Sequence, residues 1–155
     1  MTSSLNPKQE TARTRDDWLR STRALCNAFA NHSSIEQIID CFTSSQQDNI
    51  LLFEHGLPEL APFVGRAFQG TQGIRDYFGV VSEHLSYKAM SFSDYSVDTE
   101  LAVVSVRGSA EFTCKSTGKH WNECFIYRIQ LDDDGKIVVY EVWADTGAAY
   151  LASSE

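Results

Sequence analysis

The feature that most constrains the fold is a change in hydrophobic period near Tyr87. Before this point, apolar residues recur at every third or fourth position, as on one face of an α-helix. After it, apolar and polar residues alternate, as in half-buried β-strands. This separation of helices from strands predicts an α+β domain with an antiparallel sheet.

Three helices are predicted in the first half of the chain. The first begins near Asp16, the second is short and follows Ser34, and the third covers about residues 71–85. The apolar positions that define them are Trp18, Thr22, Leu25, Cys26 and Phe29, then Ile35, Ile38, Ile39 and Phe42, then Ile74, Tyr77, Phe78, Val81 and Leu85. One strand, residues 49–55, precedes a loop rich in Gly and Pro.

Four long strands are predicted in the second half, over residues 87–98, 101–115, 119–131 and 136–145, before a short helix at 146–152. Their connections have hairpin length and contain turn-forming residues, as in Asp132-Asp133-Asp134-Gly135. Long antiparallel strands of this kind curl around the elements that cover them. We expect the three N-terminal helices to pack into a curved, mainly antiparallel sheet that forms a cone.

The 155 residues are enough for one domain. Residues 1–14 are polar and are predicted to form a disordered or loosely docked tail, with a single domain over 15–155. The segment Met1 to Arg15 has no apolar core, so no secretory signal is expected. The four cysteines have no CxxC spacing and are expected to be reduced thiols in a cytoplasmic protein.

The formal charge argues against several classes of partner. It is 13 − 21 = −8, which disfavours nucleic acid and an anionic membrane surface. The chain has no HxxxH or CxxC pair that would indicate zinc, so no metal and no organic cofactor are expected.

Three stretches resemble the SnoaL-like branch of the NTF2-like superfamily. They are Leu-Phe-Glu-His-Gly at 52–56 with Phe-Gln-Gly-Thr-Gln-Gly-Ile-Arg-Asp-Tyr-Phe at 68–78, Asp-Gly-Lys-Ile at 134–137, and Glu-Val-Trp-Ala-Asp at 141–145. The resemblance implies an NTF2-like cone. It also implies relatives such as polyketide cyclases, ketosteroid isomerases and scytalone dehydratases, which keep an acid/base group inside the cone. The same fold also serves as a plain binding module.

The candidate catalytic residues are one histidine and three carboxylates. The resemblance places His55 near the general base of the ketosteroid isomerases, and Asp145 where the epoxide hydrolases carry a working Asp. The family pattern also turns the Ile137 side of the last strand inward, which brings Glu141 into the cone with Asp145. Strand alternation turns Glu123 inward and leaves Glu54 exposed. A carboxylate in an apolar pocket has a raised pKa and can exchange protons near neutral pH.

Aromatic side chains are expected to bind the substrate. The candidates are Phe53, Tyr77, Trp121, Phe125, Tyr127 and Trp143. Tyr77, Tyr87, Tyr95 and Tyr127 are alternatives for a hydroxyl donor. A homodimer is expected through the outer sheet face, with Ile126, Tyr140 and Val142 as its apolar patch.

The hypothesis that follows is a cofactor-independent enzyme that isomerises, cyclises or dehydrates a small apolar metabolite such as a polyketide or terpenoid. Its alternative is a non-catalytic binding or dimerisation module, in which arginines pair with the acids and aromatic side chains fill the interior. A third possibility is a hydrolase in which a buried carboxylate activates water.

Overall fold

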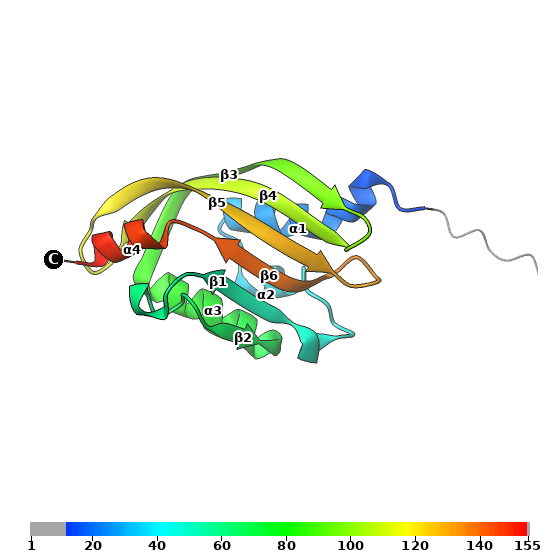
Figure 1. Ribbon diagram of the computed structural model, residues 1–155, viewed down its shortest axis with the longest axis horizontal. Coiled ribbons are helices and arrows are strands. Elements are labelled where there is room, and N and C mark those ends of the chain that lie inside the picture. The colour runs from blue at the N-terminus through cyan, green and yellow to red at the C-terminus, as the bar shows by residue number, and fades with distance from the viewer. Residues whose placement is uncertain (1–11, 155) are drawn as a thin grey trace, which may run out of the picture.

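A six-stranded sheet is the framework of the computed structural model, which describes residues 12–154 (Figure 1). Its strands are β1 (Leu51–His55), β2 (Ala67–Gln69), β3 (Leu85–Asp98), β4 (Val103–Cys114), β5 (His120–Leu131) and β6 (Ile137–Trp143). The helices are α1 (Arg15–Ala30), α2 (Ile35–Ile39), α3 (Gly70–His84) and α4 (Thr146–Ser153). The strand order is β2-β1-β6-β5-β4-β3, and only the β1–β6 pair is parallel. The predicted α+β class is confirmed.

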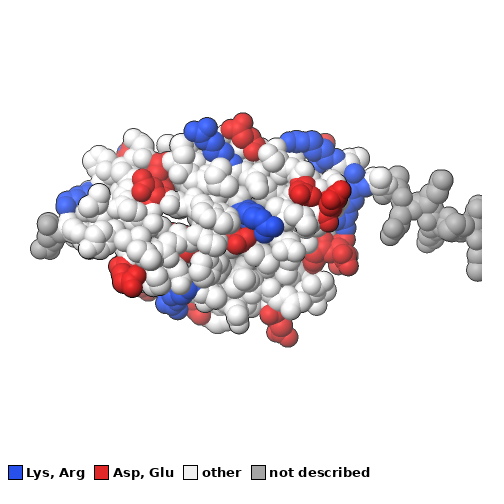
Figure 2. All heavy atoms as spheres, viewed as in Figure 1, with Lys and Arg blue, Asp and Glu red and all other residues white. Residues whose placement is uncertain are grey.

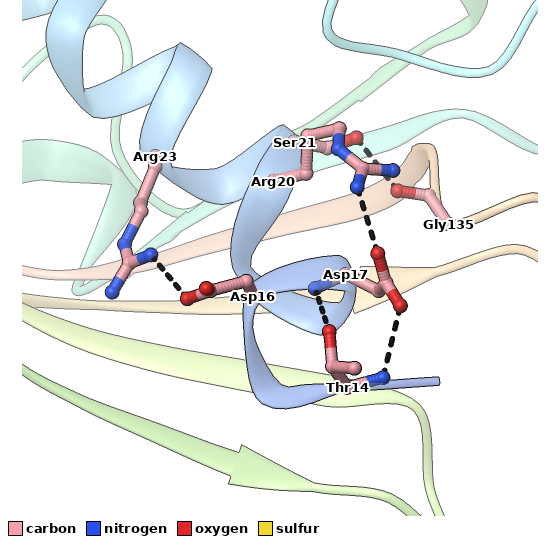
Figure 3. Close-up of polar contacts among 7 residues, drawn as sticks. All are labelled: Thr14, Asp16, Asp17, Arg20, Ser21, Arg23 and Gly135. Atoms are coloured by element: carbon pink, nitrogen blue, oxygen red, sulfur yellow. Dashed lines mark hydrogen bonds and ion pairs between the residues drawn. The ribbon is translucent and has the colours of Figure 1, made fainter. Parts of the chain in front are cut away.

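The start of α1 is fixed by a capping box. Thr14 is the N-cap, its hydroxyl accepts a hydrogen bond from the Asp17 backbone N–H at 3.2 Å, and the Asp17 carboxylate accepts one from the Thr14 N–H at 2.9 Å (Figure 3). Asp16 therefore lies within the first turn, where its charge favours the positive end of the helix, and is not the cap. The Ser21 hydroxyl donates to the Gly135 carbonyl at 2.6 Å and so fastens α1 to the β5–β6 hairpin (Figure 3). Most of the predicted tail lies outside the described residues.

The long strands β3, β4 and β5 arch over the helices (Figure 1). Two register shifts, between Lys88 and Ser91 and between Ser93 and Ser96, interrupt the β3–β4 pairing. Bulges of this kind bend a strand and increase its twist. Helices α1 and α3 contact the sheet at opposite ends, α1 against β3 and α3 against β1 and β2.

The side-chain alternation predicted from the sequence holds in β5 but not in β1 and β6. Phe125 and Tyr127 of β5 face the core as expected, and Val104 and Val106 of β4 are buried with them. In β1 and β6 the buried face instead carries Leu52 and Glu54 together with Tyr140 and Val142, which pair across the two strands. This face of β6 has no charged residue between Val138 and Ala144, so its burial avoids the desolvation of a charge.

The surface carries charges of both signs. Figure 2 shows Lys and Arg side chains scattered among Asp and Glu on the viewed face, with no continuous basic area on that face. Among residues 12–154, no helix has the length and hydropathy needed to cross a membrane.

Candidate active site

A cavity of about 350 Å³ opens between the concave face of the sheet and the helices. Helices α1, α2 and α3, strands β1, β3, β4, β5 and β6, and the first half of α4 contribute residues to its lining. Nine aromatic side chains line it: Phe29, Phe63, Tyr77, Phe78, Tyr87, Phe112, Phe125, Tyr127 and Tyr140. A volume near 350 Å³ lies at the lower end of the range for small-molecule sites.

Glu54 lies inside this cavity. The residue is 6% exposed, and its Oε1 accepts a hydrogen bond from the Tyr77 hydroxyl at 2.6 Å. The pKa of Glu54 is raised from 4.5 to about 7, chiefly by burial; the Tyr77 hydrogen bond opposes this rise, and the negative charge of Glu123 adds to it. A carboxyl group with this pKa exchanges its proton near neutral pH, which a general acid or base requires.

Glu123 and Asp145 form a second acidic group at the α4 end of the cavity. The Trp121 indole N–H donates to Glu123 Oε1 at 2.9 Å, and the Asp145 backbone N–H donates to Glu123 Oε2 at 2.8 Å. Burial raises the pKa of Glu123, and these two hydrogen bonds lower it in part. The Asp145 carboxylate caps α4 by accepting from the Ala148 N–H at 2.9 Å.

Three tyrosines line the cavity near Glu54. Tyr77, Tyr127 and Tyr140 are buried, and the Tyr127 and Tyr140 rings have centroids 5.0 Å apart. Burial holds the pKa of each hydroxyl well above its usual range. These hydroxyls therefore stay protonated at neutral pH. The Tyr77 hydroxyl donates to Glu54, which leaves those of Tyr127 and Tyr140 to donate hydrogen bonds to an oxygen of a ligand.

Five of the residues predicted from the sequence line the cavity: Glu123, Asp145, Tyr77, Phe125 and Tyr127. Tyr87, one of the alternative hydroxyl donors, also lines it, although its hydroxyl donates to the Phe29 carbonyl at 2.7 Å. Trp121 does not line it, but it contacts two residues that do: its indole N–H donates to Glu123, and its ring stacks on Phe112.

His55, Glu141, Phe53 and Trp143 lie on the outer face of the sheet, so their predicted inward placement is wrong. There His55 Nε2 lies 3.1 Å from Glu141 Oε1, and Arg128 donates to Glu141 Oε2 at 3.0 Å. The His55 ring stacks on Trp143 with centroids 4.1 Å apart. The parallel β1–β6 pairing aligns Phe53 with Glu141 and His55 with Trp143, so these four side chains share the face opposite that of Glu54 and Val142. The predicted apolar patch for a dimer is also wrong for two of its three residues: Tyr140 and Val142 are buried in the core, whereas Ile126 is exposed.

Glu54 and Tyr140 are the two site residues that the sequence pattern places on the wrong face. An inward His55 implies an outward Glu54, and an inward Glu141 implies an outward Tyr140, because neighbouring residues of a strand point to opposite faces. The signal that could have found both is in β6, where Val138, Tyr140, Val142 and Ala144 form the uncharged face. An uncharged face is the better core face, and placing it inward turns Glu54 inward through the pairing with β1.

No set of His, Cys, Asp and Glu side chains within residues 12–154 is grouped to hold a metal ion. The polar side chains at the cavity carry carboxyl and phenol groups, the imidazole of His32 and the hydroxyls of Ser82, Ser86 and Thr146. Together they can move protons and donate hydrogen bonds to a bound molecule.

No protein-family model and no curated protein matches the chain. Solved structures do match. An NTF2-like protein of unknown function from Burkholderia pseudomallei is 13% identical, with 90% of this chain and 98% of that chain covered and a TM-score of 0.75. A presumed isomerase from Bacillus subtilis is 17% identical, with 89% and 95% covered and a TM-score of 0.67.

A presumed SnoaL-like polyketide cyclase from Mesorhizobium loti is 13% identical to the chain. The match covers 79% of this chain and 95% of that chain, with a TM-score of 0.61. At these identities the likeness concerns the backbone arrangement, and it agrees with the fold that the sequence motifs indicated. The chain has the NTF2-like fold, with helices packed into a curved sheet around a cavity.

Proposed function

We propose that this protein is a proton-transfer enzyme of the isomerase or cyclase type that acts on a small, mostly apolar metabolite. The observation that carries the proposal is Glu54, a carboxyl group with a pKa of about 7 inside an aromatic cavity, held by the Tyr77 hydroxyl at 2.6 Å. Structural neighbours described as a presumed isomerase and a presumed polyketide cyclase support the same reaction class.

The proposed mechanism uses side chains of the cavity. Ionised Glu54 removes a proton from a carbon next to a carbonyl group, while Tyr77 holds the carboxylate in position. The protonated hydroxyls of Tyr127 and Tyr140 donate to the oxygen on which negative charge develops. Glu54 then returns the proton to another carbon, which completes an isomerisation. Alternatively, the carbanion attacks a second carbonyl and closes a ring, and Glu54 returns the proton to the alkoxide oxygen that forms.

The alternative hypothesis, a plain binding module, predicts that arginines pair with the acids and that aromatic side chains fill the interior. Within the described residues, Arg128 pairs with Glu141 on the outer face, and neither Glu54 nor Glu123 at the cavity forms an ion pair. The cavity of about 350 Å³ also leaves room for a substrate. Both features favour catalysis over the binding module.

The test is the isomerisation of β,γ-unsaturated cyclic ketones to their conjugated isomers, followed by ultraviolet absorbance. We expect Glu54→Gln to lower kcat/KM by roughly 100-fold or more, the typical contribution of a general acid–base group. His55→Gln is the matched control, because it changes the next residue of the same strand on the outer face and should leave the rate within about twofold. The activity should rise with pH through about 7, since Glu54 must be ionised to accept the proton. Equal rates for wild type and Glu54→Gln would overturn the proposed role.

A further inference from the structure

The ionisable side chains at the cavity are mainly acidic. Its lining contains three carboxylates, Glu54, Glu123 and Asp145, and one imidazole, His32, but no lysine or arginine. Among the described residues, none of these carboxylates forms an ion pair with a basic side chain. Their partners are the Tyr77 hydroxyl, the Trp121 indole N–H and backbone N–H groups, all of which are neutral.

The carboxylates also repel one another. The charge of Glu123 raises the pKa of Glu54, and the charge of Asp145 raises the pKa of Glu123, each in addition to the larger effect of burial. An anionic ligand would add to this repulsion, whereas a cation would relieve it. The formal charge of −8 on the chain acts in the same direction by attracting cations toward the protein.

The walls suit an organic cation. Phe29, Tyr77, Phe78, Tyr127 and Tyr140 form one connected aromatic group, with ring centroids 4.9 to 6.3 Å apart. Aromatic faces attract a positively charged nitrogen through the ring quadrupole, and they also cover its apolar substituents. Glu54 is more than nine-tenths buried among these rings, and among the described residues only Tyr77 donates to its carboxyl group.

We propose that the substrate class of this cavity is a lipophilic amine, bound as an ammonium or iminium cation between the aromatic walls and the carboxylates. The inference rests on the proposed function in that both place the substrate beside Glu54. It keeps the proton transfer at Glu54 and, for an iminium substrate, replaces the neutral carbonyl by a cationic C=N⁺ group as the activating group.

An iminium substrate fits the proposed proton transfer. Glu54 takes the proton from the carbon next to the C=N⁺ bond, the C–H electron pair becomes a C=C bond, and the C=N⁺ π electrons move to nitrogen. The products are a neutral enamine and a neutral carboxylic acid, so a pair of opposite charges disappears inside an apolar cavity. Separated charges are costly in such surroundings, and this change therefore favours the reaction.

The test is a matched series of ligands measured by isothermal titration calorimetry. The three probes are 3-phenylpropyl-trimethylammonium, its neutral tert-butyl isostere and 4-phenylbutyrate. We expect the ammonium compound to bind at least about tenfold more tightly than the neutral isostere, and the carboxylate to bind most weakly. Equal affinities for the ammonium compound and the isostere, or a preference for the carboxylate, would overturn the inference.

The pH dependence identifies the group that recognises the cation. If only ionised Glu54 binds it, a pKa of about 7 predicts an increase of about tenfold in affinity between about pH 6 and about pH 8. The other titratable groups around Glu54 are Tyr77 of α3, Glu123 and Tyr127 of β5, and Tyr140 of β6. Glu54→Gln should remove most of this increase, and Glu123→Gln should remove any remaining part. His55→Gln should leave it unchanged.

The proposed function and the proposed substrate class can be overturned independently of each other. The ligand series is an equilibrium measurement and retains its meaning even if the protein turns over no substrate. Conversely, Glu54-dependent isomerisation of neutral ketones without any preference for the cation would leave the proton-transfer function standing and overturn the amine class alone.

Discussion

Glu54 shows how one residue can serve function at the expense of stability. Its pKa is raised because the folded protein buries the carboxyl group, so folding favours the protonated form. The stabilisation associated with this form is fully present below the ordinary pKa of 4.5 and is lost as the pH rises through about 7. At neutral pH and above, the folded state therefore carries a buried negative charge that the unfolded chain leaves in water.

The first prediction is that Glu54→Gln stabilises the protein at alkaline pH. The difference between 4.5 and about 7 corresponds to roughly 3 kcal/mol. Because Gln is neutral and its carbonyl oxygen can still accept from Tyr77, we expect an increase of about 2–3 kcal/mol in the free energy of unfolding near pH 8. The increase should disappear near pH 4.5. Urea denaturation at both pH values measures it.

Glu59 supplies the control for this measurement, because it is exposed on the surface after β1. Glu59→Gln should change the free energy of unfolding equally at the two pH values. The difference in stability between the wild type and Glu54→Gln could instead be the same at pH 8 and at pH 4.5. That result would show that Glu54 ionises as easily in the folded protein as in the unfolded chain.

The placement of single residues was the least predictable property of the site. Glu123, Phe125 and Tyr127 could be placed from the sequence because one face of β5 is clearly more apolar than the other. Both faces of β1 and β6 are partly apolar, and a one-residue error moves every side chain to the opposite face. For this reason the sequence pattern predicted His55, and not Glu54, as the residue of β1 that faces the cavity.

At the scale of elements, Asp145 combines two roles. It caps α4 through the Ala148 N–H and lines the cavity next to Glu123. Asn and Asp are equally good N-caps, whereas Ala is a poor one. We therefore expect Asp145→Ala to reduce stability by about 1 kcal/mol and Asp145→Asn to leave it within about 0.5 kcal/mol, as measured by thermal or chemical unfolding. A loss of the same size in both variants would show that the charge, not the cap, stabilises this end of the cavity.

Gly108 in β4 lets the Phe125 ring lie flat against the sheet. A Cβ atom at this position would lie 2.1 Å from Phe125 Cε2, well inside van der Waals contact. We expect Gly108→Ala to destabilise the protein by about 1–3 kcal/mol, because the ring must move into the cavity or the strands must separate. The free energy of unfolding and the affinity for aromatic ligands should both fall.

Gly79 in α3 is the matched control for this substitution. A Cβ atom there meets nothing within 4 Å, and the position is helical and exposed. Gly79→Ala should therefore stabilise the protein by up to about 1 kcal/mol, because Ala is the better helix former. If Gly108→Ala were as harmless as Gly79→Ala, the close approach of Phe125 would have no structural importance.

For the whole molecule, the order of helices and strands was largely predictable, since long periodic segments determine it. The pairing of β1 with β6 was not, because it joins segments far apart in the chain and depends on how the sheet closes. Strand β2 was also missed, because its three residues lie in a loop rich in Gly and Pro. These two features decide which side of β1 faces the cavity.

The correction of the sheet faces also changes the expected dimer. We propose that two chains associate through the outer sheet face. Ile126 and Trp143 pair across β5 and β6 there, and they are 42% and 43% exposed. His55, Glu141 and Arg128 surround them with a polar rim, an arrangement typical of protein interfaces. A dimer would have a mass of 2 × 17.4 kDa, which light scattering after size-exclusion chromatography distinguishes from 17.4 kDa.

The dimer is best tested by placing a charge within this apolar pair. Ile126→Asp should shift the protein toward the monomer, because burying an unpaired carboxylate at an interface is unfavourable. Leu151→Asp is the control, since Leu151 is 69% exposed on α4, away from the outer face. The control should leave the mass unchanged. A monomeric wild type would overturn the proposed dimer. A dimer that Leu151→Asp disrupts and Ile126→Asp does not would place the interface away from the outer sheet face.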